Sequence, residues 1–151
     1  MAESIGKQLP ELLLRKLKKE QYVLFATVDQ ETGAPQVNAV SWVYAADEKT
    51  IRIAVGHRSR MIGNVKAQPH VTITMIGPET THAITGRARV THEPLEGVTI
   101  KLACIEVEVE TVRDVMFYGA KIAQEPIYEK TYDKEAADKL DRQVMAALQE
   151  A

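Results

Sequence analysis

The chain has 151 residues, which is enough for one domain with a buried core. Its acidic and basic side chains almost cancel, and the formal net charge of −2 argues against a general attraction to nucleic acid or to membrane surfaces. The single cysteine, Cys104, excludes an intramolecular disulfide and a cysteine-rich zinc site. No signal peptide is recognisable, and no apolar run approaches the ~20 residues of a membrane-spanning helix. We therefore expect a soluble, cytoplasmic protein.

The N-terminal third predicts a helix followed by strands. Residues 9–19 form the helix, because Pro10 suits its first turn and Leu13 and Leu17 lie on one apolar stripe. Runs of β-branched and aromatic residues between turn sequences predict strands at residues 22–29, 35–44 and 50–55. Both alternating sets of side chains in 35–44 are largely apolar, which is typical of a strand covered on both faces.

The rest of the chain predicts a short helix, more strands and a final helix. Pro69 ends the short helix at residues 59–68, and strands follow at 71–76, 82–91 and 98–112. The apolar positions in the last strand change from even to odd numbers near Cys104, which predicts a bulge or a sharp bend there. Asp133 is a suitable cap for the helix at 134–149.

This order of elements indicates the fold class. Six strands with only one helix-sized insertion predict a mainly β protein, a small antiparallel barrel flanked by terminal helices. A doubly wound parallel sheet would need a helix after nearly every strand. Neither a linker nor a repeat divides the chain, so we expect a single domain over residues 1–151.

The most informative local feature is an acid-free segment between Glu48 and Glu79. Its cationic and titratable side chains are Lys49, Arg52, His57, Arg58, Arg60, Lys66 and His70. Cations at the start of the helix 59–68 oppose the helix dipole unless an anion joins them, and free N–H groups there favour a phosphate. We expect His57, Arg58, Ser59 and Arg60 to bind one, whereas Lys49 and Arg52 are expected to be solvated. A solvated basic turn without a ligand remains the alternative.

Other chemistry-bearing residues predict less. The four histidines do not have the spacing of a metal site, and no motif of a nucleophilic enzyme is present. Cys104 is expected to be a small buried side chain. Glu106, Glu108 and Glu110 alternate with valines and are expected to form a solvated strand face.

The segment from Asp47 to Val55, then Ser59-Arg60, Asn64 and Pro69, resembles the pyridoxamine 5′-phosphate oxidase-like FMN-binding split barrels, in particular their small general-stress-protein-type members. The resemblance implies a six-stranded antiparallel split barrel of the FMN-binding type. It also implies that Ser59 and Arg60 hold the flavin phosphate. The expected partner is a second copy of the chain, with the cofactor in the subunit interface of a homodimer.

The resemblance implies further that the strand around residues 38–42 meets the flavin ring, and Tyr118 and Lys121 are our candidates for contacts from the partner chain. The expected cofactor-binding residues are Asn38, Val40, Ser41, Trp42, Val55, His57, Arg58, Ser59, Arg60, Asn64, Tyr118 and Lys121. The vitamin B6 oxidases carry Lys and Arg where this chain has Met61 and Ala39, so true pyridoxamine phosphate oxidase activity is not expected.

The basic helix start and the resemblance together favour an FMN flavoprotein with oxidoreductase activity, in which the cofactor supplies the electron chemistry. A non-catalytic flavin-binding or stress-related protein is one alternative. The same barrel binding the deazaflavin F420 or haem is another, with His57 or His82 as the candidate axial ligand for haem.

Overall fold

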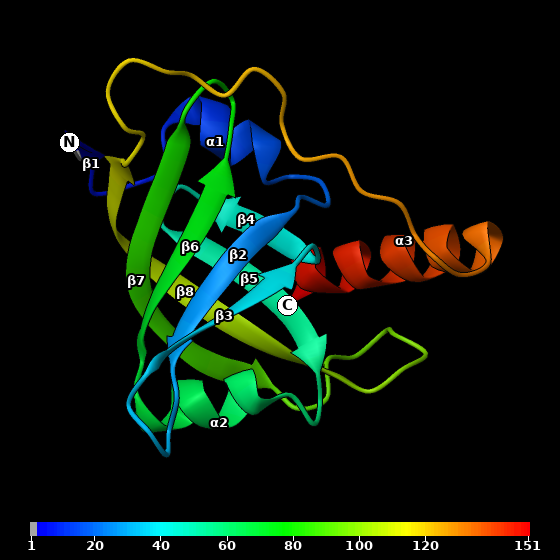
Figure 1. Ribbon diagram of the computed structural model, residues 1–151. Coiled ribbons are helices and arrows are strands. Elements are labelled where there is room, and N and C mark those ends of the chain that lie inside the picture. The colour runs from blue at the N-terminus through cyan, green and yellow to red at the C-terminus, as the bar shows by residue number, and fades with distance from the viewer. Residues whose placement is uncertain (1–2) are drawn as a thin grey trace.

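The computed structural model describes residues 3–151 (Figure 1). Its elements in chain order are β1 (Glu3–Gly6), α1 (Glu11–Lys16), β2 (Val23–Val28), β3 (Pro35–Val40), β4 (Val43–Asp47), β5 (Thr50–Gly56), α2 (Arg60–Ala67), β6 (His70–Ile76), β7 (Thr81–His92), β8 (Leu102–Asp114) and α3 (Lys134–Glu150). The strands form one antiparallel sheet in the order β3-β2-β6-β7-β8-β5-β4, with β1 beside β8. The end strands β3 and β4 do not pair, so the barrel is split. The mainly β split-barrel prediction is confirmed, with eight strands in place of six.

The predicted strand 35–44 is interrupted at Ser41 and Trp42. The main-chain carbonyl of Ser41 accepts hydrogen bonds from the N–H groups of Gln21 and Val43, and the chain changes partner strand there, from β2 to β5. The expectation of cover on both faces is wrong for β3, which has no buried residue and leaves Val37 58% exposed. It holds better for β4, which packs between the barrel interior and α3.

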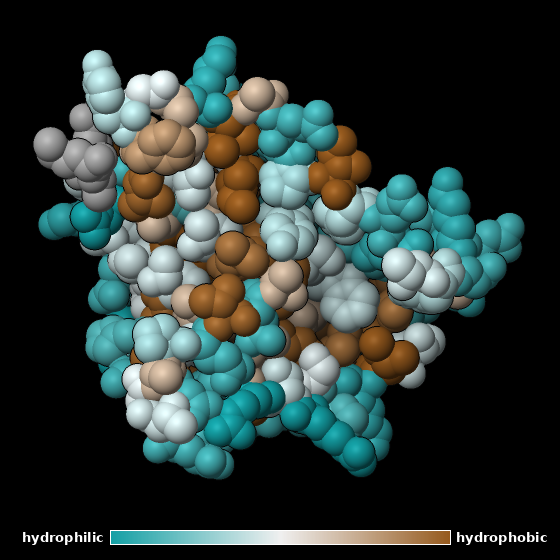
Figure 2. All heavy atoms as spheres, viewed as in Figure 1, coloured by the Kyte–Doolittle hydropathy of each residue, from teal (hydrophilic) through white to brown (hydrophobic). Residues whose placement is uncertain are grey.

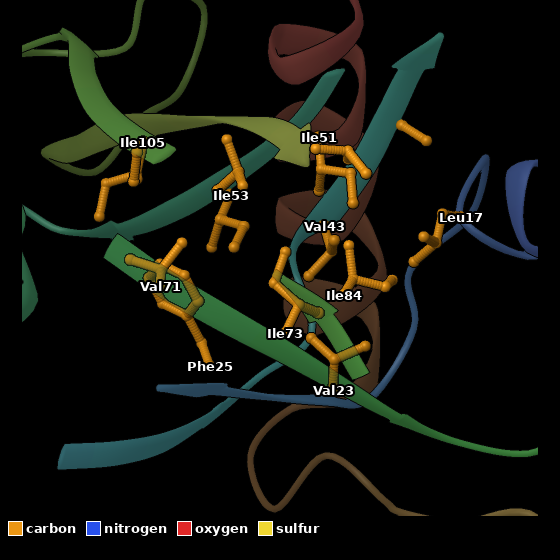
Figure 3. Close-up of a cluster of buried hydrophobic side chains, with 14 of the residues drawn as sticks. Leu17, Val23, Phe25, Val43, Ile51, Ile53, Val71, Ile73, Ile84 and Ile105 are labelled. Carbon is orange, nitrogen blue, oxygen red and sulfur yellow. The ribbon is translucent and has the colours of Figure 1, made fainter. Parts of the chain in front are cut away.

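Two apolar clusters explain the parity change at Cys104. The larger cluster fills the barrel, where side chains such as Phe25, Ile53, Ile73 and Ile105 point toward one another (Figure 3). The smaller cluster lies between the outer face of β5 and β8 and α3, and its members are Ala54, Leu95, Leu102, Cys104, Val144, Ala147 and Leu148. Residues 102–105 of β8 are therefore buried on both faces. The predicted irregularity is a register shift in β7, between Val90 and His92, opposite Ile105 and Cys104.

The helices cover the openings and one side of the barrel. In Figure 1, α1 and α2 lie at opposite ends of the barrel, and α3 extends along the side formed by β4 and β5. Asp133 caps α3 by accepting a hydrogen bond from the Ala136 N–H, as predicted. The long connection between β8 and α3, residues 115–133, passes over the end of the barrel next to α1 (Figure 1). We call this stretch the connecting segment.

The expectation that Arg52 is solvated is wrong. Its side chain is 17% exposed, pairs with Glu106 at 3.3 Å, and donates from Nη1 to the carbonyl of Leu148 at 2.9 Å. Because the last turn of α3 contains no basic residue, Arg52 supplies the positive charge that a helix C-terminus favours. Glu106 is held between Arg52 and Arg89, whereas Glu108 and Glu110 are exposed as expected.

Within residues 3–151, no helix combines the length and the apolar character needed to cross a membrane. The same residues contain no group of three or more His, Cys, Asp or Glu side chains that could hold a metal ion.

Candidate cofactor site

An open groove lies where β3 gives way to β4, facing the end of β5 and the start of α2. Its volume is about 360 Å³, within the range of roughly 300–1,000 Å³ that is usual for small-molecule sites. The lining residues are Ala39, Val40, Ser41, Trp42, Ala54, Val55, Gly56, Ser59, Met61, Lys130 and Tyr132. Most of these side chains are apolar, and the polar ones gather toward the start of α2 and toward the connecting segment.

The end of the groove at α2 attracts negative charge. Ser59 caps the helix, and its Oγ accepts a hydrogen bond from the N–H of Met61 at 3.1 Å. The first turn of α2 contains no acidic residue, so the positive end of the helix dipole is not neutralised from within. The exposed side chain of Arg58 has no hydrogen bond or ion pair with any of residues 3–151. This arrangement suits a phosphate group.

Arg60, the other arginine of this turn, already has carboxylate partners. Its Nε lies 2.6 Å from Oδ1 of Asp29, and its Nη2 lies 3.6 Å from Glu31. The hydrogen bond from Arg60, followed by that from the main chain of Thr32, holds the pKa of Asp29 well below its usual range. Arg60 thus joins α2 to the turn between β2 and β3.

Two further predicted residues have partners away from the groove. The ring Nδ1 of His57 lies 3.1 Å from the carbonyl oxygen of Lys101. Asn64 is completely buried, donates to Thr27 Oγ1 at 3.0 Å and accepts from the N–H of Gln30 at 3.0 Å. These contacts make Asn64 a link between α2 and β2.

A polar network supports the opposite end of the groove. The ammonium of Lys130 lies 2.7 Å from Oε2 of Glu20 and 3.1 Å from Oδ1 of Asp141. The same two oxygens accept hydrogen bonds from Ser41 Oγ at 2.8 Å and from the indole N–H of Trp42 at 2.9 Å. Each of these two groove residues is therefore attached to Lys130 through one carboxylate.

The structure brings only part of the predicted set together. Val40, Ser41, Trp42, Val55 and Ser59 line the groove, and His57, Arg58 and Arg60 flank Ser59 in the chain.

The remaining predicted residues lie elsewhere in the protomer. Asn38 lies in β3 next to the groove residue Ala39 but does not line the groove itself, and its Oδ1 accepts a hydrogen bond from Nε2 of Gln36. Tyr118 and Lys121 lie on a different surface, where Tyr118 is 99% exposed and Lys121 is 3.7 Å from Glu79.

Sequence reasoning missed Lys130 and Tyr132. Both belong to the connecting segment and follow Ser59 by more than 70 residues in the chain. The available signal was the sequence from Tyr128 to Tyr132, where a lysine stands between two aromatic residues. The ring of Tyr128 lies 6.0 Å from the ring of Tyr22, measured between centroids, so this part of the connecting segment contacts the chain just before β2. Burial, followed by the Glu20 carboxylate, raises the pKa of Tyr128 to about 12.

Solved structures with the same fold have names that give different functions. An F420 reductase is 22% identical, with 69% of this chain and 98% of that chain covered and a TM-score of 0.57. General stress protein 26 of Bacillus anthracis str. Sterne is 12% identical, with coverage of 72% and 98% and a TM-score of 0.54. The haem storage protein HutZ of Vibrio cholerae is 14% identical, with coverage of 75% and 95% and a TM-score of 0.52. Identities this low show the fold alone.

No curated protein sequence matches the chain. A family model does, however: the model for pyridoxamine 5′-phosphate oxidase matches residues 9–116, which include β2 to β8 and every groove residue except Lys130 and Tyr132. Because this match extends over more than half of the chain, the protein belongs to the pyridoxamine 5′-phosphate oxidase family.

Proposed function

We propose that the protein is an FMN-binding flavoprotein with oxidoreductase activity. One observation carries the proposal: an apolar slot beside Val40, Trp42 and Val55 leads directly to the acid-free start of α2. A planar apolar ring with a phosphate on a flexible tail has the matching distribution of polarity. Membership of the pyridoxamine 5′-phosphate oxidase family supports a flavin as that ligand.

Different residues of the groove would contact the phosphate and the ring. Arg58, the Ser59 hydroxyl and the positive end of the α2 dipole would hold the phosphate. Val40, Trp42 and Val55 would contact the ring and exclude water from it. Bound FMN would supply the electron chemistry, so the chain needs no nucleophile of its own. Met61 and Ala39 replace the Lys and Arg of the vitamin B6 oxidases, and we therefore do not propose pyridoxamine phosphate as the substrate.

We also propose that the protein works as a homodimer. The groove of one protomer is open to solvent along β3, and this edge strand is apolar in sequence although none of its residues is buried. Figure 2 shows apolar side chains interrupting the polar surface over β2, β3 and β6. A partner that covers β3 would bury Val37 and close the groove. Tyr118 and Lys121 of the second copy would then be available to the flavin.

Arg58→Ala tests the phosphate assignment. We expect FMN affinity to fall about 10- to 100-fold, because hydrogen bonds to charged groups contribute roughly 1.5–3 kcal/mol. Arg60→Ala is expected to have a smaller effect, since Asp29 already shares its guanidinium. Arg87→Ala, an exposed cation of β7 away from the groove, is the matched control. Titration of cofactor-free protein with FMN, followed by flavin fluorescence, measures all three affinities, and equal affinity in wild type and Arg58→Ala would contradict the assignment.

F420 is the second candidate, because it also carries a phosphate and a structurally similar F420 reductase exists. Haem is less well supported, since the groove lining contains no histidine. The absorption spectrum of freshly purified protein separates flavin, deazaflavin and haem. Bound flavin that neither NADH nor NADPH reduces would favour the non-catalytic alternative.

A further inference from the structure

We propose that Lys130 is a positioning residue of the groove, which orients Ser41 and Trp42 through Glu20 and Asp141. The proposal rests on the proposed function in one respect, namely that this groove is the cofactor site. It assigns a role to the part of the connecting segment at residues 117–133, which follows the last residue that the family model matches.

The geometry is a branched network with Lys130 at its centre. The ammonium contacts one oxygen of each carboxylate, and each of those oxygens also accepts a hydrogen bond from a groove residue. The two groove residues are neighbours in the chain, at the break between β3 and β4. Main-chain hydrogen bonds from Gln21 to the Ser41 carbonyl and from Ala54 to the Trp42 carbonyl hold their backbone. These bonds leave the side-chain torsions free, and the network provides one side-chain hydrogen bond for each residue.

Charge explains why the network needs Lys130. Among residues 3–151, this lysine is the only cation within salt-bridge distance of Glu20 or Asp141. The carboxylates are 21% and 16% exposed, and the two oxygens lie within about 6 Å of each other, a range over which like charges repel appreciably. Without the ammonium, at least one carboxylate would turn toward water. Trp42 would lose its acceptor if Asp141 moved, and Ser41 would lose its acceptor if Glu20 moved.

The titration behaviour of Lys130 agrees with this account. Burial acts to lower the pKa of Lys130, but hydrogen bonds to Glu20 and Asp141 outweigh it and raise the pKa above the ordinary value of 10.5. The ammonium is thus charged at neutral pH, as the two carboxylates require.

Lys130→Met tests the proposal, and Trp42 is a direct probe because it is the only tryptophan in the chain. In protein without cofactor, we expect the emission of Trp42 to shift to longer wavelength and acrylamide quenching to increase. We expect the dissociation constant for FMN to rise about tenfold. Lys130→Arg keeps the charge and the donors and should restore both readouts. If Lys130→Met does not fold, Lys130→Gln provides the same test.

Lys16→Met is the matched control. Lys16 also pairs with the connecting segment, from α1 to Glu125 at 3.4 Å, but it has no hydrogen bond or ion pair with Glu20, Ser41, Trp42 or Asp141. We expect its Trp42 emission and FMN affinity to equal those of wild type. Unchanged Trp42 emission in a folded Lys130→Met, an equal change in Lys16→Met, or failure of Lys130→Arg to restore the signal would each overturn the proposal. If wild type binds no FMN, the proposed function fails, while the emission of Trp42 still decides the role of Lys130.

Discussion

At the scale of single residues, the charged side chains that matter join parts of the chain that are far apart in sequence. Arg60 pairs with Asp29, Arg52 donates to the end of α3, and Lys130 bridges two carboxylates. Of these three interactions, the Arg60–Asp29 pair should make stability depend most on pH. The Asp29 carboxylate also accepts hydrogen bonds from the N–H groups of Glu31 and Thr32. All of these contacts favour the ionised carboxylate.

Asp29→Asn should change how stability responds to acid. The pKa of Asp29 is lowered in the folded protein from its ordinary value of 3.8, so the ionised carboxylate stabilises the fold above pH 3.8, and this contribution is lost as pH falls toward the depressed pKa. We therefore expect wild type to exceed Asp29→Asn in free energy of unfolding by a constant amount between pH 7 and 5. The difference should shrink below pH 3.8. Urea unfolding across this range measures it, and a difference independent of pH would contradict the assignment.

At the scale of elements, the paired strands β7 and β8 approach each other closely at one of their register shifts. This shift lies between Thr85 and Gly86 of β7. A Cβ at Gly86 would clash with the main-chain carbonyl oxygen of Glu108 and lie 2.8 Å from Cγ1 of Val107. Neither neighbour is the free end of a long side chain, so the strands themselves would have to move apart.

Gly86→Ala should therefore destabilise the protein. Overpacking of this kind costs about 1–3 kcal/mol, and we expect the free energy of unfolding to fall by that amount. Gly56→Ala is the control, because a Cβ there has no atom within 4 Å. Denaturant unfolding of both variants measures the difference. Equal stability of the two variants would show that β7 and β8 can relax at this position.

At the scale of the whole molecule, the second copy should complete the site. Val37→Glu places a charge in the middle of exposed β3, where a surface substitution changes protomer stability by only about 0.5 kcal/mol or less. We expect wild type to sediment at about twice the protomer mass of 16.8 kDa and Val37→Glu to sediment as single protomers with weaker FMN binding. Lys139→Glu, on an exposed position of α3, is the control and should remain dimeric. A Val37→Glu protein that is still a dimer would place the interface elsewhere.

Much of the fold follows from local patterns. The helices that contain Leu13 and Val144 and the strands that contain Phe25, Ile53 and Ile73 were predictable, because apolar periodicity and turn residues act over a few neighbours. Local patterns predicted one continuous strand through Ser41, where the structure has two strands. A continuous apolar strand and one that is interrupted have the same composition. They also misjudged β3, whose apolar side chains remain exposed in the single protomer.

The sequence by itself determined that a helix start without acidic residues follows a buried strand, because Val55, Ser59 and the missing acids are all local features. It also determined that the groove residues 40–42 are apolar or neutral. Only the tertiary structure decided which cationic side chain pairs with which carboxylate. In the folded protein Arg60 pairs with Asp29, Arg58 has no partner among residues 3–151, and Lys130 lies at the groove. Long charged side chains pair with the carboxylates that lie near them in space. Those carboxylates come near only when β2, the connecting segment and α3 have packed together.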